Sequence, residues 1–399
     1  SEMCIRDRLL VSGFFASCNY LNIDDYFEDT FQEDSIYANK RNIERYFNGA
    51  AALLPVVDKI WEYGNTPGVT GSDEAVSCGD WNGMVVIQFS GTKLMNNEIT
   101  SSSMGGWTWD FNIWPKCYKV IRKVNTILPH IDGVRDMNSF ERMEFRAKCR
   151  FLRAYAYYLI LQQNGPMILL GDEIVSNNEE AEYYARTRNT YDECVTYITN
   201  ELVLAAQALP LDRAIQEIAR PTRGAALALR AKVLLYAASP LMNGQTPADI
   251  ASELVDDQGN RLLPEAYDES KWAKAAAAAK DVIELNRYTL FVSYATDKGD
   301  IAFPATIAPP YHPEFSEQAW PNGWKDIDPF ESYRAIFNGT VSAFENKELI
   351  FTRGQNTGDQ SINNMVIHQL PRVAKGWNTH GLTCLLYTSP SPRDMRRSR

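Results

Sequence analysis

Residues 144–170, EFRAKCRFLRAYAYYLILQQNGPMILL, are the stretch that decides the fold of this chain. Its apolar and aromatic side chains recur close to every 3.6 residues, which predicts an amphipathic helix. Those side chains are Phe151, Leu152, Tyr155, Tyr158, Leu159 and Leu161. The sequence Asn164-Gly165-Pro166 predicts the end of the helix, followed by a short extended run. Three interleaved alanines, Ala147, Ala154 and Ala156, would let a second helix approach closely. Taken alone, the stretch also fits an ordinary core helix.

Composition limits the class of protein. The chain has 399 residues, of which 45% are hydrophobic and 23% charged, so it can bury a large core. Its net charge of −10 and the lack of a basic stripe argue against nucleic acid as a partner. The 9 Trp, 20 Tyr and 17 Phe residues suit a protein that binds flat apolar faces, although many of them must be core.

Cysteine and histidine patterns indicate neither a disulfide framework nor a metal site. Cys117, Cys149 and Cys194 lie among apolar neighbours on predicted helices, so we expect buried free thiols. The four histidines are scattered without metal-ligand spacing. The sequence also contains no phosphate-binding loop and no familiar catalytic motif, so we expect no cofactor, no metal and no catalytic residues.

Further helices are predicted along the chain over residues 35–63, 108–129, 189–209 and 222–239, and from Ser270 onward. Pro129 is expected to end the second of them, and Thr190 and Glu193 form a capping box at the start of the third. Ser270 is expected to cap the last. Because alanines recur where two helices would meet, the series predicts antiparallel hairpins like those of tetratricopeptide repeats.

Individual side chains on these helices are assigned by their spacing. Trp114 and Tyr118 fall on the helical period and are predicted to be core, as are Tyr155 and Tyr158. On the last helix, we expect the inward face to consist of Trp272, Ala276, Ala279 and Ile283.

The N-terminal run Leu9 to Cys18, LLVSGFFASC, resembles a bacterial lipoprotein signal in which Cys18 carries the lipid. The alternative is a buried strand with a chance cysteine. The extremities SEMCIRDR and LLYTSPSPRDMRRSR resemble translated sequencing-adapter read-through. We therefore expect three parts: residues 1–18 as a signal remnant with a foreign start, 19–384 as the folded domain, and 385–399 as a foreign tail without order.

Six blocks in a fixed order resemble the SusD/RagB family of nutrient-uptake lipoproteins. The blocks are WPKCYKVIRKVNTIL, EFRAKCRFLRAYAYYLILQQNGPMIL, RTRNTYDECVTYITNELVLAAQALP, RPTRGAALALRAKVLLYAASPL, WAKAAAAAKDVIELNRYTL and FENKELIF. The chain departs from the family in having Gln163-Asn164-Gly165-Pro166 where Tyr-Gly-Gly-x-Pro is usual. Family members also continue past GWNTHGLTC, so we expect the C-terminal part of the fold to be missing.

The resemblance implies a mostly α protein: tetratricopeptide-like helical hairpin repeats packed against a loop-rich irregular region with few short strands. It also implies a lipid anchor on the outer face of the outer membrane. There the protein would hold an oligosaccharide or another large nutrient for a partner, a SusC-like TonB-dependent transporter. The resemblance implies no catalysis.

Two loop regions are candidates for binding a glycan, because aromatic rings stack on the C–H faces of sugars while polar groups bind the hydroxyls. The first is Asp80-Trp81-Asn82. The second is the Pro/Trp-rich stretch 304–330, which includes His312 and offers Tyr311, Trp320, Asn322 and Trp324. The alternative interpretation is that each Trp only pins its own loop.

Two other functions remain open. An all-α glycoside hydrolase would need two carboxylates, and Asp80 and Asp326 are candidates, although no spacing singles out a pair. A tetratricopeptide-type scaffold would instead use the helical face to bind another protein.

Overall fold

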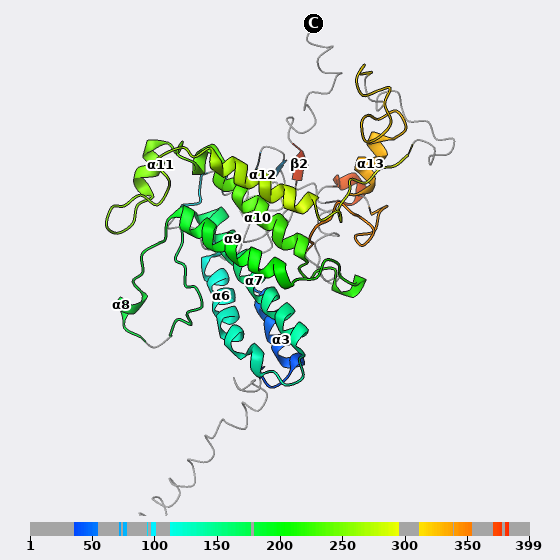
Figure 1. Cartoon of the computed structure of the whole chain (residues 1–399). Helices are drawn as coiled ribbons and strands as arrows, with labels where there is room; N and C mark the ends of the chain where they lie inside the picture. Colours follow the sequence, from blue (N-terminus) through cyan, green and yellow to red (C-terminus); the bar gives the residue numbers. More distant parts are fainter. Residues whose placement is uncertain are drawn as a thin grey trace, which may run out of the picture.

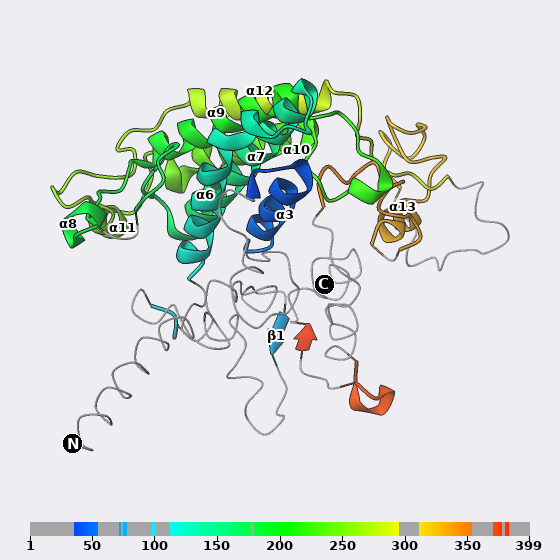
Figure 2. The same ribbon diagram turned by 90° about the horizontal axis from the view of Figure 1, so that it is seen from below.

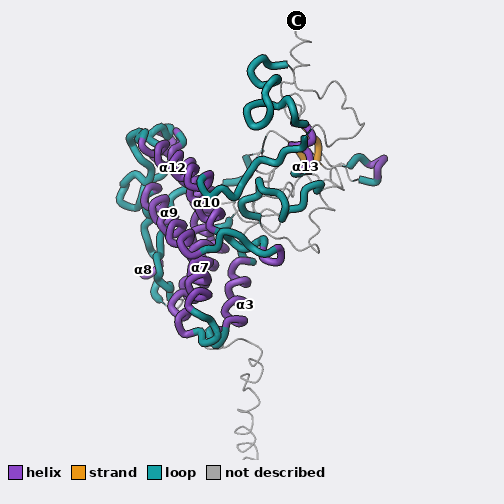
Figure 3. Tube along the Cα trace, turned by 45° about the vertical axis from the view of Figure 1, so that its right-hand side comes forward, coloured by secondary structure: helices purple, strands orange, loops and turns teal. Residues whose placement is uncertain are grey.

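The structure is a computed structural model that describes residues 36–54, 72, 75–77, 94, 97–100, 112–176, 179–294, 311–337, 339–352, 370–376 and 380–382. This part of the chain is mostly helical, with long loops on both sides of the helices (Figure 3). Two three-residue strands, β1 (Ala75–Ser77) and β2 (His380–Leu382), pair antiparallel. The predicted fold class, with helical hairpins, a loop-rich region and few short strands, is confirmed.

Six helices form what we call the helical layer. They are α3 (Lys40–Ala51), α6 (Trp114–Ile127), α7 (Ser139–Asn164), α9 (Tyr191–Ala208), α10 (Arg223–Ala238) and α12 (Ser270–Ile283). Neighbours in this order pack on one another, so that α7 lies between α6 and α9, and α10 between α9 and α12 (Figures 1 and 2). No helix among the described residues is long and apolar enough to span a bilayer.

Shorter elements lie in the connections. They are α8 (Ala181–Tyr184), α11 (Ala248–Glu253), α13 (Pro329–Ala335) and the 3₁₀ turns η3 (Leu128–Gly133), η4 (Ile215–Glu217), η5 (Pro240–Met242) and η7 (Arg372–Ala374). In Figures 1 and 2, α8 and α11 protrude at the same end of the helical layer. The opposite end of the layer is near α13.

Local sequence signals explain where the long helices begin and end. At α7, the Asn138 side chain accepts from the Glu141 amide while the Glu141 carboxylate accepts from the Asn138 amide. The same reciprocal pair joins Thr190 and Glu193 at α9, which confirms the predicted capping box. Helix α7 ends at Gly165, whose φ of 73° favours glycine.

Two predicted helix starts were wrong, whereas the predicted end at Pro129 was close. Helix α3 starts at Lys40, after an Asn39 cap, rather than at residue 35. The description of this segment ends at Leu54, so the predicted helix end at residue 63 lies outside the described residues. Helix α6 ends at Ile127, just before Pro129 as expected, and the chain continues as the tighter turn η3, in whose first positions proline is tolerated. Ser270 is the first residue of α12 rather than its cap, and its amide donates to the Asp268 carboxylate.

The predicted inward face of α12 was also wrong. Ala275 and Ala278 are buried, whereas the side chains of Trp272 and Ile283 are 40% and 73% exposed. The helix contains five consecutive alanines, Ala275 to Ala279, so this stretch shows no difference in hydrophobicity between one helix face and another. The two larger side chains therefore set the predicted period, and they lie on the outside.

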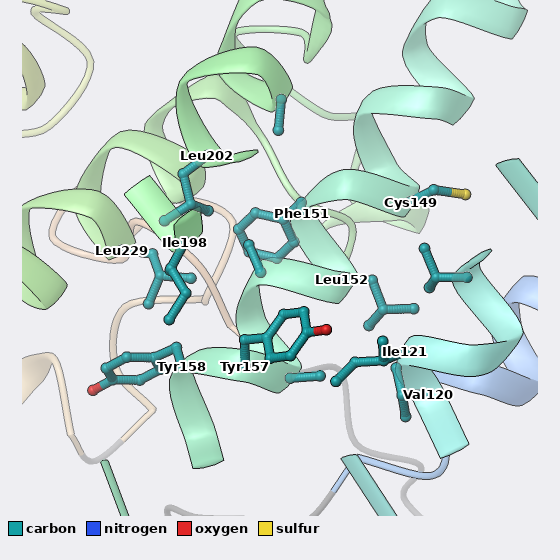
Figure 4. Packing of buried hydrophobic residues seen from close by; sticks show 14 of the residues in the cluster. Val120, Ile121, Cys149, Phe151, Leu152, Tyr157, Tyr158, Ile198, Leu202 and Leu229 are labelled. Carbon is teal, nitrogen blue, oxygen red and sulfur yellow. The ribbon is translucent and has the colours of Figure 1, made fainter. Parts of the chain in front are cut away.

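The main hydrophobic core lies between α6, α7, α9 and α10. Figure 4 shows Phe151 and Tyr157 of α7 between Ile121 of α6 and Ile198 of α9. The alanines Ala147, Ala154 and Ala156 are fully buried along α7, which confirms their predicted role as close-approach positions. Trp114 and Tyr118 pack on this core as partly buried residues.

The three described cysteines, Cys117, Cys149 and Cys194, are buried free thiols, as predicted. Burial raises the pKa of the Cys117 and Cys149 thiols to about 12, and that of Cys194 to about 11. They are therefore neutral at physiological pH and contribute to packing rather than to chemistry.

A buried polar network joins three helices of the layer through Arg153, whose side chain is 1% exposed. Its guanidinium binds Glu201 of α9 at 2.7 Å, Asn125 of α6 at 2.7 Å, and the Asp172 carboxylate at 2.6 Å. The network also includes the Gly171 carbonyl, at 2.9 Å. It thus fixes the turn after α7 from which the α8 segment projects.

Candidate ligand-binding site

The candidate site is the segment 311–328, which we call the aromatic loop. It leads into α13 and lies beyond the end of the helical layer, in the gold-to-orange part of Figure 1. Its backbone folds back on itself: the Trp324 amide donates to the Phe315 carbonyl at 3.1 Å, and the Lys325 amide to the Gln318 carbonyl at 3.0 Å. The loop is therefore held in shape by its own hydrogen bonds.

Three rings gather inside the aromatic loop. The His312 and Phe315 rings are stacked with centroids 4.8 Å apart, and the Phe315 and Trp324 rings lie 5.6 Å apart. His312 and Trp324 meet edge to face at 6.3 Å. Offset and tilted ring pairs of this kind stabilise a loop beyond their simple burial.

Gly323 lies where the end of the loop passes close to the backbone of Phe315 and Gln318, and glycine is required there. A Cβ added there would lie 2.1 Å from the Phe315 carbonyl oxygen and 2.5 Å from that of Gln318. Both contacts are to backbone, which cannot move without breaking the hydrogen bonds described above. The close approach of Phe315 and Trp324 therefore depends on a residue without a side chain.

Trp320 and Asn322 lie at the turn of the same loop. The Trp320 amide donates to the Asp326 carboxylate at 2.8 Å, and its ring is half-buried. The Asn322 side chain is exposed, while its amide donates to the Ala319 carbonyl. An indole and a carboxamide thus share one short turn.

The aromatic loop is anchored at its C-terminal end. The Asp328 amide donates to the Ser293 carbonyl at 2.8 Å, and Ile327 forms a bridge with Tyr294. The Asp328 side chain then accepts from the Glu331 amide and caps α13. This joins the loop to the segment that leaves α12, so that its position relative to the helical layer is defined.

Four predicted site residues lie on this loop: Tyr311, Trp320, Asn322 and Trp324. Tyr311 is the most accessible of them, at 71% exposed. The other predicted group, Asp80, Trp81 and Asn82, lies outside the described residues, as does Cys18.

Phe315 was not predicted, although it lies at the centre of the ring cluster. The signal that could have found it is the spacing His312-x-x-Phe315, which places two rings on one side of a single turn. Trp324 packs against Phe315, so it also serves the loop-pinning role considered for each Trp. Tyr311 and Asn322 are exposed, whereas Trp320 is half-buried like Trp324.

Asp326, a candidate acid for the hydrolase alternative, accepts the Trp320 amide and thereby shapes the loop. The nearby Glu317 pairs with Lys325 at 3.6 Å. Among the described residues, no three His, Cys, Asp or Glu side chains converge to form a metal site. What the loop offers is therefore rings flanked by amide, carboxylate and hydroxyl groups.

Comparison with known proteins agrees with this architecture. Residues 50–235 match the sequence model of the SusD-like family described as starch-binding and associating with the outer membrane. That segment includes α6, α7 and α9 and most of α10. No protein with curated annotation matches the chain.

Solved structures share the fold. BT4246 superposes with a TM-score of 0.63 at 22% identity, over 84% of this chain and 52% of that protein. A SusD-like protein from Bacteroides fragilis NCTC 9343 (BF3747) superposes with a TM-score of 0.57 at 20% identity, over 89% and 53% respectively. The chain therefore spans about half the length of these relatives. Residues 50–235 of this chain therefore match the SusD-like family in sequence, and the chain shares its fold with SusD-like proteins.

Proposed function

We propose that this protein binds a glycan at the cell surface and passes it to a SusC-like TonB-dependent transporter. The observation that carries the proposal is the aromatic loop: a loop held by its own backbone hydrogen bonds, with exposed Tyr311 and Asn322 and half-buried Trp320, in a chain that matches the SusD-like family. The ligand would be an oligosaccharide or another large nutrient. The protein would hold it without chemical change.

The physical basis is stacking on a pre-formed surface. Sugar rings present C–H faces to aromatic side chains, while amides and carboxylates bind the hydroxyls that remain. A loop that is already held by its own backbone hydrogen bonds loses little conformational entropy on binding. The bonds from Trp324 to Phe315 and from Lys325 to Gln318 support such pre-organisation.

Localisation and partner belong to the same proposal. The family description places its members in association with the outer membrane, and Cys18 in its signal-like context would supply the lipid anchor. Asp80, Trp81 and Asn82 are proposed as a further group of ligand contacts. The transporter would then receive the ligand from the side of the protein that carries the aromatic loop.

Affinity electrophoresis on gels that contain starch or other polysaccharides tests the ligand assignment. We expect Trp320→Ala and Tyr311→Ala to reduce retardation at least tenfold in apparent affinity on the glycan that the wild type binds. Trp272→Ala is the matched control, because Trp272 is an exposed indole on α12 and not on the aromatic loop. Equal retardation of all three variants, with unchanged circular dichroism, would refute the assignment.

Two measurements separate this function from its alternatives. New reducing ends after incubation with the same glycans would indicate a hydrolase. For the scaffold alternative, the triple variant Trp81→Ala, Trp320→Ala and Trp324→Ala is assayed for transporter association. We expect glycan retention to fall while association survives, whereas loss of association would favour a protein-binding role.

A further inference from the structure

The aromatic loop carries an excess of negative charge. Residues 311–328 contain one ammonium, that of Lys325, and four carboxylates, those of Glu314, Glu317, Asp326 and Asp328. With the imidazole counted as neutral, one positive group against four negative groups gives this segment a net charge of −3, in a chain whose total is −10. Helix α13, which follows, contains one glutamate and one arginine and so adds no net charge. The candidate site is therefore more acidic than the chain as a whole.

The charge of Asp326 is fixed beside the candidate ligand groups. Its Oδ1 atom accepts the Trp320 amide at 2.8 Å, which holds the carboxylate at the turn that also carries Asn322. Asp326 itself is half-buried, whereas Glu314 and Glu317 are exposed on the same loop. A carboxylate only accepts hydrogen bonds, so a ligand group that meets Asp326 must be a donor, such as a hydroxyl.

The single ammonium does not offset this charge. Lys325 pairs with Glu317 at 3.6 Å, and the two side chains are 61% and 62% exposed. If Lys325 turned toward a ligand, Glu317 would lose its partner, so the net charge of the segment would stay the same. His312 supplies no second cation in this arrangement, because its Nδ1 atom accepts the Glu314 amide at 3.2 Å and so carries no proton. An anionic ligand group would therefore meet no unmatched cation on residues 311–328.

We propose that the aromatic loop selects uncharged glycans and rejects glycans that carry carboxylate or sulfate groups. This inference rests on the function proposed above, and it names the class of sugar that the same site accepts. The hydroxyls of a neutral sugar can donate to Asp326 and exchange hydrogen bonds with Asn322, while its C–H faces stack on the rings. An acidic sugar would instead bring a further anion to a surface that is already negative, and such like-charge contacts are strongly disfavoured.

Coulomb's law gives the size of the effect. Two like charges about 7 Å apart in water repel by an amount that lowers affinity roughly threefold. Asp326 and Glu314 together should therefore weaken the binding of an acidic derivative about tenfold at low ionic strength. In roughly 0.5 M salt the screening length falls to about 4 Å, so this discrimination should largely vanish, whereas stacking on the rings should persist.

Affinity electrophoresis on matched derivatives of one polysaccharide tests the proposal. Hydroxyethyl and carboxymethyl derivatives of starch, cellulose and guar galactomannan, at equal degrees of substitution, differ in charge but little in bulk. At low salt, we expect the wild type to bind at least one hydroxyethyl polymer and to bind its carboxymethyl counterpart about tenfold more weakly. Roughly 0.5 M NaCl should bring the two affinities within about twofold of each other.

Single-charge variants assign the discrimination to the loop. Asp326→Asn keeps an oxygen for the Trp320 amide but removes the charge, so the ratio of carboxymethyl to hydroxyethyl affinity should rise about threefold. Lys325→Gln removes the one ammonium of the segment, so the same ratio should fall by a similar factor. The ratio cancels any change that a variant causes in glycan binding as a whole.

Glu182→Gln is the matched control. It removes an exposed carboxylate from α8, which lies at the opposite end of the helical layer from α13 (Figures 1 and 2). The ratio for this variant should equal that of the wild type. An equal rise in the ratio for Glu182→Gln and Asp326→Asn would assign the discrimination to the net charge of the whole chain and overturn the inference.

Two further outcomes would overturn it. Carboxymethyl polymers, polygalacturonate or dextran sulfate bound as strongly as the neutral polymers would do so while leaving glycan binding intact. Retardation by none of these polymers would contradict the proposed function itself, and the inference with it.

Discussion

The helical layer and the aromatic loop are stabilised in different ways. In the layer, many apolar side chains from α6, α7, α9 and α10 share one buried core, and Arg153 ties three elements together within it. In the aromatic loop, the shape depends on a few backbone hydrogen bonds, one glycine and three rings. The layer should therefore determine whether the chain folds, and the loop whether it binds.

The comparison has a functional consequence. A layer with a large shared core tolerates change at its surface, because a single exposed side chain contributes little to its stability. A loop held by single contacts can change its ligand by changing one residue, without loss of the fold. Substitutions in the two regions should accordingly separate stability from binding.

The largest effect is expected from Arg153→Met in the helical layer. The change leaves Glu201 buried with only Arg150 as an ion partner, so the free energy of unfolding should fall by about 3 kcal/mol. Arg146→Met is the control, because the pair with Asp132 is exposed and should contribute less than about 1 kcal/mol. Urea unfolding followed by far-UV circular dichroism measures both. Equal losses in the two variants would contradict the central role of Arg153.

Overpacking an alanine contact should have the next largest effect. Ala154 is fully buried between helices, so Ala154→Leu should cost about 1–3 kcal/mol of unfolding free energy. Ala273→Leu, on the exposed side of α12, should be nearly neutral. The same urea titration compares them, and a neutral Ala154→Leu would show that the helices do not approach closely there.

Most of the helical layer could be predicted from the sequence, but two of its features could not. The layer was predictable because its signals are local: capping residues, the 3.6-residue period and alanines at contacts such as Ala154. The inner face of α12 was not, since five consecutive alanines contain no period. The network of Arg153 also escaped prediction, because its partners Glu201 and Asp172 are distant in sequence.

The candidate site was predictable only in part, and for a related reason. Rings and amides in a Pro/Trp-rich stretch suggested a binding loop, and Trp320 and Asn322 do share one turn. The contacts that shape the loop are not periodic. The clash that makes Gly323 necessary, and the stacking of Phe315 on His312, follow from the three-dimensional path of the backbone.

Gly323→Ala should affect the loop and spare the layer. The new Cβ collides with the Phe315 carbonyl, so the loop must open and glycan retention should fall at least fivefold. The unfolding midpoint should change little, because the core is untouched. Gly133→Ala is the control, since a Cβ there meets nothing within 4 Å. If both variants retained the glycan equally, the loop geometry would be irrelevant to binding.

The smallest effect is expected at the α8 segment, which is held by the exposed pair of Glu173 and Arg186. The side-chain hydrogen bond from Arg186, with a second from Tyr183, lowers the pKa of Glu173 to about 2. The pair therefore stabilises the segment fully above the ordinary glutamate pKa of 4.5, and this contribution is lost as pH falls toward 2.

Hydrogen exchange of the α8 amides measures this tether. In the wild type, protection of the Tyr183 amide should persist at pH 4 and disappear near pH 2. Glu173→Gln should abolish it at both pH values, whereas Glu182→Gln, an exposed residue of the same turn, should not. Protection in Glu173→Gln equal to that of the wild type would assign the order of this segment to other contacts.

Hydrogen exchange in the presence of a bound glycan most directly tests whether the aromatic loop binds the ligand while the helical layer only supports the fold. We predict new protection of amides in the aromatic loop, including Trp320 and Trp324, and unchanged exchange in α6, α7, α9 and α10. Protection that appears instead on the helical layer, with none in the aromatic loop, would contradict the account.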